Sequence, residues 1–342
     1  MRLFALIIFA LIFTASLAAG SGLVFAQIPV GDFVQVEVSP ETPRSQQNVT
    51  ITVRSFSIDI QNSMLTWKVN GTQVAQGKGV TVQQVQTGKP GVTTVVDITI
   101  QTADGVSVAK KVTLNPGDVD IIWETDSYVP PFYKGRPWFT YQGELNLVAV
   151  PNFITKSGAR IDPKTLVYTW EQDGRVLGSF SGYGKNSLKL KGGVLIKPTE
   201  IAVTVTGQGA DMPRAETSMA LEATEPEIVF YEESPLYGTL YNKAVGNAFT
   251  LRDSEATFTA VPYFFSNSSK NTDALGYTWS INNRERADLG ETESITLRQK
   301  ADVEGSSSVA LTIKNAQDIF QEARKAFTVQ FTKKASADPI EF

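Results

Sequence analysis

Short stretches of alternating hydrophobic and polar residues cover most of the chain. In residues 49–53 and 95–101, β-branched residues alternate with neighbours of the opposite character. A period of two residues is typical of strands with one buried face and one face in water. Longer strands are expected at 200–206 and 307–314, and a helical turn is expected only at 318–325. The pattern therefore predicts an all-β chain built from short strands.

Three tryptophans recur in the same local context. Trp67, Trp170 and Trp279 each follow a threonine that is itself preceded by leucine or tyrosine. The second lies 103 residues after the first and the third 109 residues after the second, a period as long as a domain. At a fixed offset after each tryptophan comes a pair of residues that favours tight hairpins, namely Asn70-Gly71, Asp173-Gly174 and Asn282-Asn283.

A second signature, Val-x-x-Phe, precedes each tryptophan. Its phenylalanines are Phe56, Phe153 and Phe264. We expect these three phenylalanines and the three tryptophans to mark equivalent core positions in three repeated units. The second and third units are closer to each other than either is to the first, because both extend the signature to Ala-Val-Pro.

The repeat predicts three tandem immunoglobulin-like β-sandwiches, since about seven short strands per hundred residues with a core tryptophan on the third strand is the pattern of that fold. Their expected boundaries are residues 29–117, 118–224 and 225–332. The tryptophan hairpin and the long late strand resemble the Ig-like and PKD-like modules of bacterial cell-surface proteins. That resemblance implies a stalk, a spacer or an adhesive unit.

The first 26 residues have the parts of a secretory signal peptide. Arg2 precedes an apolar stretch from Leu3 to Phe13, and Val24 and Ala26 are small residues that suit cleavage after Ala26. The alternative is an uncleaved membrane anchor, because the apolar character persists to Ala26. Both alternatives predict export to the periplasm, the cell surface or the extracellular space. Residues 333–342 are expected to form a flexible tail.

The amino-acid composition excludes several kinds of catalytic and metal-binding site. The chain has no His and no Cys, which excludes Ser-His-Asp and Cys-His catalysis, imidazole or thiolate metal sites and disulfides. Lys and Arg total 31 against 35 Asp and Glu, so nothing indicates binding to nucleic acid or to anionic lipid. We expect no cofactor, and contact with a membrane only through residues 1–26 if they are not cleaved.

The most unusual segment is 127–143, which is rich in aromatic residues and proline. One hypothesis is a binding surface for a glycan or another protein, because aromatic residues carry much of the energy of interfaces. The alternative, favoured because the third unit has a similar stretch around Leu236 and Tyr237, is that the rings fill the end of the second sandwich. The candidate partner-binding residues are Tyr128, Phe132, Tyr133, Trp138 and Tyr141.

Four acidic residues follow the first domain boundary: Asp118, Asp120, Glu124 and Asp126. Carboxylates of this kind can hold Ca²⁺, but here they lack the fixed spacing of a calcium loop. The sequence favours a solvated linker, and no metal site is predicted.

Three classes of function remain open. The leading one is a non-catalytic structural or interaction protein of the cell envelope, a component of a surface appendage or secretion assembly that contacts other envelope proteins. The second is an adhesin that binds a surface glycan or a protein through residues 127–143. The third is an enzyme such as a two-carboxylate glycoside hydrolase, which is disfavoured because the repeats leave no room for a catalytic domain.

Overall fold

A computed structural model describes most of the chain. The described residues are 34–193, 198–209, 212–300 and 304–332. The predicted signal or anchor segment, 1–26, and the predicted tail, 333–342, lie outside them. None of the helices in the described ranges has the length and apolar character required to cross a bilayer.

The chain forms two compact units. The described part of the first unit comprises residues 34–41, 49–85 and 95–113. The second unit comprises loops 42–48 and 86–94 together with the described residues from 114 onward.

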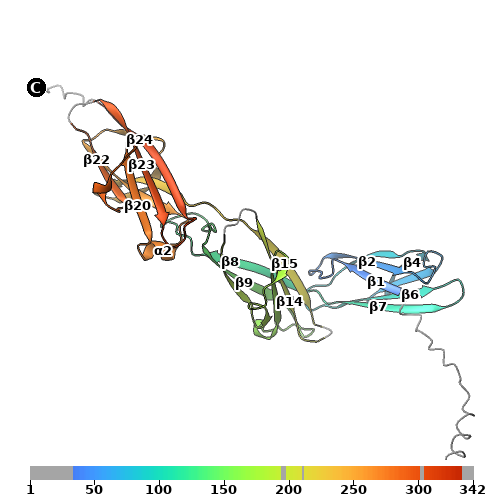
Figure 1. Ribbon diagram of the computed structural model, residues 1–342. Helices are drawn as coiled ribbons and strands as arrows, with labels where there is room; N and C mark the ends of the chain where they lie inside the picture. The colour runs from blue at the N-terminus through green and yellow to red at the C-terminus, as the bar shows by residue number, and fades with distance from the viewer. Residues whose placement is uncertain (1–33, 194–197, 210–211, 301–303, 333–342) are drawn as a thin grey trace, which may run out of the picture. The chain divides into compact units, whose positions relative to one another are not determined.

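The first repeat contains a three-stranded and a four-stranded sheet, with strand orders β1-β2-β5 and β4-β3-β6-β7 (Figure 1). Its strands are β1 (Val34–Ser39), β2 (Asn48–Ser55), β3 (Met64–Val69), β4 (Thr72–Lys78), β5 (Val82–Gln86), β6 (Thr94–Gln101) and β7 (Ser107–Leu114).

The second repeat has the sheet orders β13-β9-β8 and β11-β10-β14-β15, with β12 also paired to β10. Its strands are β8 (Asp118–Thr125), β9 (Glu144–Asn152), β10 (Val167–Gln172), β11 (Arg175–Val176), β12 (Gly182–Tyr183), β13 (Ser187–Lys191), β14 (Thr199–Thr206) and β15 (Arg214–Leu221). A single 3₁₀ turn, η2 (Pro163–Thr165), precedes β10.

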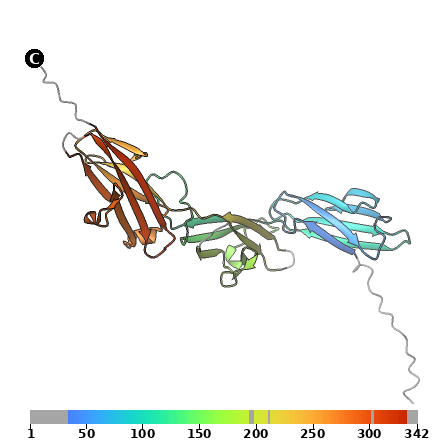
Figure 2. The ribbon, with the colours of Figure 1, turned by 45° about the horizontal axis from the view of Figure 1, so that its top comes forward.

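The third repeat has the sheet orders β17-β16-β19-β22 and β18-β24-β23-β20-β21, seen from a second direction in Figure 2. Its strands are β16 (Glu227–Ser234), β17 (Gly238–Ala244), β18 (Ala248–Leu251), β19 (Glu255–Tyr263), β20 (Leu275–Ile281), β21 (Arg284–Glu285), β22 (Ser294–Arg298), β23 (Gly305–Asn315) and β24 (Glu322–Phe331). Its short helices are α2 (Asn267–Asn271) and η3 (Ala287–Leu289).

These pairings make three immunoglobulin-like sandwiches. In each, the first two strands share a sheet with a later strand, and the tryptophan strand lies in the opposite sheet between a hairpin partner and a long strand. The tryptophan strand of each sandwich pairs antiparallel with both of its main neighbours, and β18 pairs parallel with β24. The prediction of an all-β chain of three tandem Ig-like sandwiches is therefore confirmed.

The three tryptophans occupy the same place in their sandwiches. Trp67, Trp170 and Trp279 are at most 1% exposed, and each indole N–H donates to a main-chain carbonyl 13 to 15 residues further on. The donor–acceptor distances are 2.8, 3.0 and 2.8 Å. Each ring is therefore buried with its one polar atom satisfied, as a large core side chain requires.

The turn pairs form the predicted hairpins. Asn70, Asp173 and Asn282 have φ of 51°, 50° and 48°, and the residue after each also has positive φ, which is the signature of the tight type I′ turn. The side-chain oxygen of each first residue also accepts a main-chain N–H from the neighbouring long strand, at 2.9 to 3.0 Å. The hairpin prediction is confirmed in all three sandwiches.

The phenylalanine signature does not mark one core position. Phe153 and Phe264 are buried, but Phe56 is 92% exposed. All three phenylalanines directly follow a strand, since β2 ends at Ser55, β9 at Asn152 and β19 at Tyr263, so their burial depends on what packs against the strand end. The expectation that Phe56 belongs to the core is wrong.

The helical turn expected at 318–325 is also mostly wrong. A turn ends at Gln321, whose N–H donates to the carbonyl of Asp318 at 2.8 Å, and β24 begins at the next residue. From there Ala323, Phe327 and Val329 are buried at even spacings, which is strand periodicity.

Candidate functional site

The aromatic segment 127–143 connects β8 to β9, and its last part belongs to the second sandwich. Phe139 is 1% exposed within the core of that sandwich. Its carbonyl accepts a hydrogen bond from the N–H of Thr224 at 2.7 Å, and Thr140 forms a parallel bridge with the same residue. Phe139 therefore packs inside the second sandwich, as the favoured hypothesis expected of all the rings in the segment.

The first part of the segment pairs with the third sandwich. The N–H of Tyr128 donates to the carbonyl of Phe265 at 2.7 Å, and the N–H of Phe264 donates to the carbonyl of Tyr128 at 2.8 Å. The N–H of Asn267 donates to the carbonyl of Asp126 at 2.8 Å. This is a short stretch of antiparallel pairing that satisfies main-chain groups of both sandwiches. We call the contact of residues 126–142 with the third sandwich the interdomain joint.

Side chains add an aromatic cluster to the joint. The ring of Tyr133 meets Tyr263 and Phe264 edge to face, with centroid distances of 6.0 and 6.2 Å. Tyr263 and Phe264 contact each other at 5.9 Å. The ammonium of Lys270 lies 4.9 Å from the ring centroid of Tyr128, within the range of a cation–π interaction. These contacts hold the segment by its rings as well as by its backbone.

One buried amide connects the joint to the third sandwich. Gln321 is 0% exposed, and its Nε2 donates to the carbonyl of Tyr141 at 2.8 Å and to Oγ of Ser266 at 2.9 Å. Its Oε1 accepts from the N–H of Ser266 and from Nδ2 of Asn315, both at 2.9 Å. A buried amide with both ends satisfied fixes the position of everything around it.

Two further contacts flank Gln321. The N–H of Phe320 donates to Oε1 of Gln142 at 2.8 Å. Nζ of Lys191 lies 2.8 Å from Oδ1 of the buried Asp318. Hydrogen bonding to that carboxylate, together with its charge, raises the pKa of Lys191. The ion pair therefore links a strand of the second sandwich to the turn that precedes β24.

The carboxylate of Asp126 is held inside the joint. Its Oδ1 accepts the N–H of Glu144 at 2.9 Å, and its Oδ2 accepts from Oγ of Ser268 at 3.3 Å. Burial raises the pKa of Asp126 above its ordinary value, and these hydrogen bonds oppose the increase only in part.

The structure divides the five candidate partner-binding residues into two groups. Tyr128, Tyr133 and the main chain of Tyr141 belong to the interdomain joint. Phe132 and Trp138 extend into solvent, at 89% and 56% exposure. Neither hypothesis from the sequence anticipated a segment that connects two sandwiches. Gln321, the buried amide that donates across the joint to the carbonyl of Tyr141, had no sequence signal at all.

The acidic candidates do not form a metal site. Asp118, Asp120 and Glu124 lie along β8, and Asp126 follows its end. The strand places Asp118 and Asp126 at opposite ends, where they bind main-chain N–H groups of Ser45 and Glu144. No group of three or more metal-ligating side chains occurs among the described residues. The solvated-linker interpretation is wrong too, because these residues are the first strand of a sandwich with Val119 buried between them.

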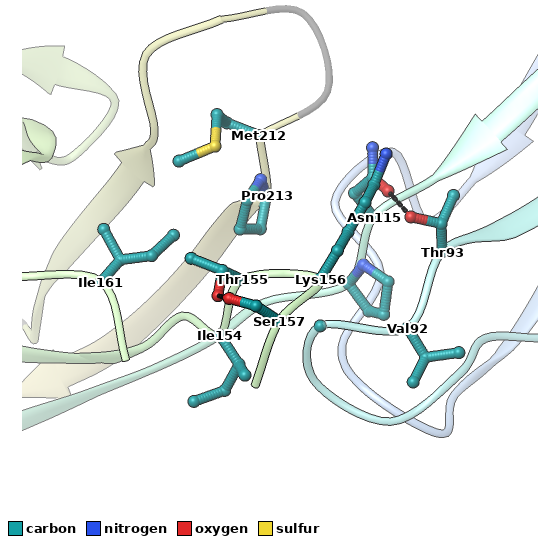
Figure 3. Close-up of a pocket in the computed structure, with 12 residues that line it drawn as sticks. Val92, Thr93, Asn115, Ile154, Thr155, Lys156, Ser157, Ile161, Met212 and Pro213 are labelled. Carbon is teal, nitrogen blue, oxygen red and sulfur yellow. Dashed lines mark hydrogen bonds between the residues drawn. The ribbon is translucent and has the colours of Figure 1, made fainter. Parts of the chain in front are cut away.

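A cavity of about 450 Å³ lies within the second unit (Figure 3). Its lining is mostly apolar, from Val92, Ile154, Ile161, Met212 and Pro213 among others. Its polar side chains are partly paired with each other, since Oγ1 of Thr93 donates to Oδ1 of Asn115 at 2.7 Å and the hydroxyls of Thr155 and Ser157 lie 2.8 Å apart. None of its twelve lining residues is a carboxylate, so it offers no acid–base pair for glycoside hydrolysis.

A second cavity, of about 490 Å³, opens beside β17 and β18 in the third sandwich. It contains carboxylates, but that of Glu255 is occupied by an ion pair with Arg298. Neither cavity is lined by the aromatic residues that the sequence singled out, whereas the interdomain joint brings Tyr128, Tyr133 and Tyr141 together.

No family model matches the chain, and no curated protein matches it. Solved structures of tandem β-sandwich proteins do. The three N-terminal domains of the bacteriophage RB49 highly immunogenic outer capsid protein match 88% of this chain and 98% of theirs, at 12% identity and a TM-score of 0.27. The Clostridium thermocellum CbhA fibronectin(III)-like modules match 56% of this chain and 94% of theirs, at 12% identity and a TM-score of 0.26.

The Bacteroides ovatus protein SGBP-B, solved in complex with a mixed-linkage heptasaccharide, matches 87% of this chain and 70% of its own, at 13% identity and a TM-score of 0.21. Likenesses at this level concern the fold alone. The chain is a tandem Ig-like β-sandwich protein, and its function must be argued from its own residues.

Proposed function

We propose that this chain is an exported, non-catalytic structural protein of the cell envelope, in which the second and third sandwiches act as one stiff spacer. The apolar segment at residues 1–26 supports export. The interdomain joint supports the spacer.

The observation that carries the proposal is the number of independent contacts at the joint. Two sandwiches connected only by a linker move relative to each other by default. Here three main-chain hydrogen bonds, an aromatic cluster and the buried Gln321 all connect them. Bending the joint would break several of these contacts together, so the pair resists bending in a way that suits a spacer.

The spacer is tested by measuring a distance across the joint in the full-length chain. Because the chain has no Cys, Val176→Cys on β11 and Arg284→Cys on β21 introduce two exposed labelling sites, one in each sandwich. Spin-label distance measurements should give a narrow distribution. Gln321→Ala should broaden it, whereas Gln330→Ala, an exposed glutamine of β24, should leave it unchanged.

A broad distribution in the otherwise unchanged chain would overturn the spacer function. A narrow distribution that Gln321→Ala leaves narrow would show that the joint is not what fixes the distance. Export is tested separately, by fractionating expressing cells and sequencing the N-terminus. We expect the protein outside the cytoplasm, cut after Ala26 or intact in the membrane, and a cytoplasmic protein contradicts the proposal.

A second candidate function is adhesion through the exposed part of segment 127–143. Phe132 is 89% exposed and has φ of 68°, a left-handed conformation that is costly for an aromatic residue. Trp138 is exposed on the same segment. An exposed aromatic residue held in a strained backbone is a recognised mark of a binding site.

A glycan array tests adhesion. Phe132→Ala combined with Trp138→Ala should abolish any binding while the protein stays folded. Phe56→Ala, which removes another exposed phenylalanine, is the matched control and should retain binding. Absence of binding by the unchanged chain, or equal loss in the control, removes adhesion to glycans from consideration.

A further inference from the structure

The segment that forms the interdomain joint has a structural counterpart in the third sandwich. In the second sandwich, residues 126–138 follow β8 and precede Thr140. Thr140 forms a parallel bridge with Thr224, just after β15, the last strand of this sandwich. Residues 235–247 lie between β16 and β18, and β18 is parallel to β24, the last strand of its sandwich. Both segments therefore leave the first strand of a sandwich and return beside its last strand.

The two counterparts differ in what covers them. In the second sandwich, Tyr128 and Tyr133 contact the next sandwich. In the third, the tip of the β16–β17 hairpin presents Leu236 and Tyr237 to solvent, at 78% and 77% exposure. The tip is nevertheless ordered, because Oγ of Ser234 accepts the N–H groups of both residues at 3.3 Å.

The tip lies at the end of the third sandwich away from the joint. The first residue of β16, Glu227, pairs with Tyr263 beside the joint, and the hairpin begins at the last residue of β16. The third sandwich therefore presents, at its far end, the same element that the second sandwich uses to hold its successor.

The receiving position at the joint is also repeated in the chain. Phe264 directly follows β19, at the end where the first residue of β16 pairs with the last residue of β19. Phe56 directly follows β2, at the end where the first residue of β1 pairs with the last residue of β2. The two phenylalanines thus occupy the same corner of their sandwiches.

Only one of the three corner phenylalanines is open. Phe264 is covered by Tyr133. The ring of Phe153 packs against the backbone at Gly117, because a Cβ atom added to this glycine would lie only 2.5 Å from the ring. Phe56 is 92% exposed. Among the described residues, the Leu236–Tyr237 tip and the Phe56 corner are therefore the donor and the receiver that remain exposed.

We infer that copies of this chain associate head to tail, with the Leu236–Tyr237 tip of one copy seated on the Phe56 corner of the next. The inference rests on the proposed structural role and names its partner, a second copy. Because donor and receiver are different surfaces, the contact is heterologous, and each copy can bind one copy through its tip and another through its corner. A contact made by one hairpin tip buries little area, so we expect it to be weak in dilute solution.

Cross-linking in the full-length chain tests this contact. Ser57→Cys places a thiol beside the corner, and Thr239→Cys places one beside the tip, in a protein otherwise free of cysteine. The two variants, one of them heavy-isotope-labelled, are mixed in mild detergent and treated with a short bis-maleimide. We expect mixed dimers at several times the yield of either like pair, and a ladder of larger species from a chain that carries both substitutions.

Removing the apolar tip supplies the control. Leu236→Ser with Tyr237→Ser, added to the Thr239→Cys variant, should reduce the mixed dimer to the yield of the like pairs. Val176→Ser, which removes an exposed apolar residue of the second sandwich, should not. Equal yields in all pairings, or a mixed dimer that survives loss of the tip, would overturn the inference. The distance across the joint does not depend on these residues, so this failure and failure of the spacer are distinguishable.

Discussion

The substitution Gln321→Ala tests the central claim about the joint. The Gln321 side chain is fully buried and makes four hydrogen bonds, two as donor and two as acceptor. Truncation to alanine removes one hydrogen bond from the Tyr141 carbonyl, from the Asn315 amide and from the N–H and hydroxyl of Ser266, and only the hydroxyl has a second bond, to Oδ2 of Asp318 at 3.3 Å. Only the bond to Tyr141 crosses to the second sandwich, so the substitution affects both the third sandwich and its connection.

The expected cost follows from the number of lost bonds. A typical hydrogen bond contributes about 1 kcal/mol net, and a buried group left unsatisfied costs about 1–3 kcal/mol. Water that enters the space vacated by the amide recovers part of this. We therefore expect the free energy of unfolding of the third sandwich to fall by about 3 kcal/mol.

Urea unfolding followed by intrinsic fluorescence measures this loss in the transition to which Trp279, one of five tryptophans, contributes from the core of the third sandwich. Gln330→Ala is the matched control, because it truncates an exposed glutamine of β24 and should change stability by less than about 0.5 kcal/mol. Gln321→Glu keeps the shape of the side chain and removes its donor group. It keeps the acceptor oxygen but places a buried carboxylate against the Tyr141 carbonyl, so its stability should recover as the pH falls and the acid protonates.

A loss below about 1 kcal/mol for Gln321→Ala would refute the reasoning, because it would mean that the buried amide contributes no more than one ordinary hydrogen bond. Equal losses for Gln321→Ala and Gln330→Ala would lead to the same conclusion. If the stability of the Gln321→Glu variant does not depend on pH, the side chain at this position is accessible to water.

Four further substitutions can be followed by unfolding in urea or on heating. Tyr133→Ala should destabilise the third sandwich by about 1–2 kcal/mol through lost ring contacts, and Phe132→Ala by less than about 0.5 kcal/mol; equal effects would refute the joint's aromatic cluster. Asn283→Gly should stabilise by about 0.5 kcal/mol, because Asn283 has φ of 63° where the other two hairpins have glycine; a loss would contradict this. Asp126→Asn should raise the melting temperature at neutral pH, because burial raises the pKa of Asp126 and its ionisation therefore costs folding stability. The advantage should shrink as the pH falls through the raised pKa and vanish below the ordinary value of 3.8. An advantage that persists in acid would count against it.

The sandwich fold could be predicted because its signals are local. A buried tryptophan, a turn pair three residues later and strands of even periodicity each lie within about ten residues of sequence, and each has a direct physical cause. The Asn70, Asp173 and Asn282 turns follow from the tolerance of these residues for positive φ.

The interdomain joint could not be predicted because its contacts are distant in sequence and largely main-chain. Tyr128 pairs with Phe265 through backbone atoms that every residue has, so the sequence carries no mark of the partner. Gln321 is one glutamine among many, and only its burial reveals its role. The aromatic character of 127–143 indicated an unusual segment, but the choice between core, joint and surface depends on what the fold places next to each ring.

The error at Phe56 has a specific cause that also explains why it is informative. The Val-x-x-Phe signature specifies the corner of a sandwich where the chain enters, and burial at that corner depends on what lies against it. In the third sandwich Tyr133 lies there, and in the second the chain itself does at Gly117. Leaving a phenylalanine exposed at the equivalent corner of the first sandwich forgoes about 1.5–3 kcal/mol of burial. A deviation from an otherwise consistent repeat is where a binding function is expected, and the exposed Leu236–Tyr237 tip is the element that we infer binds at this corner.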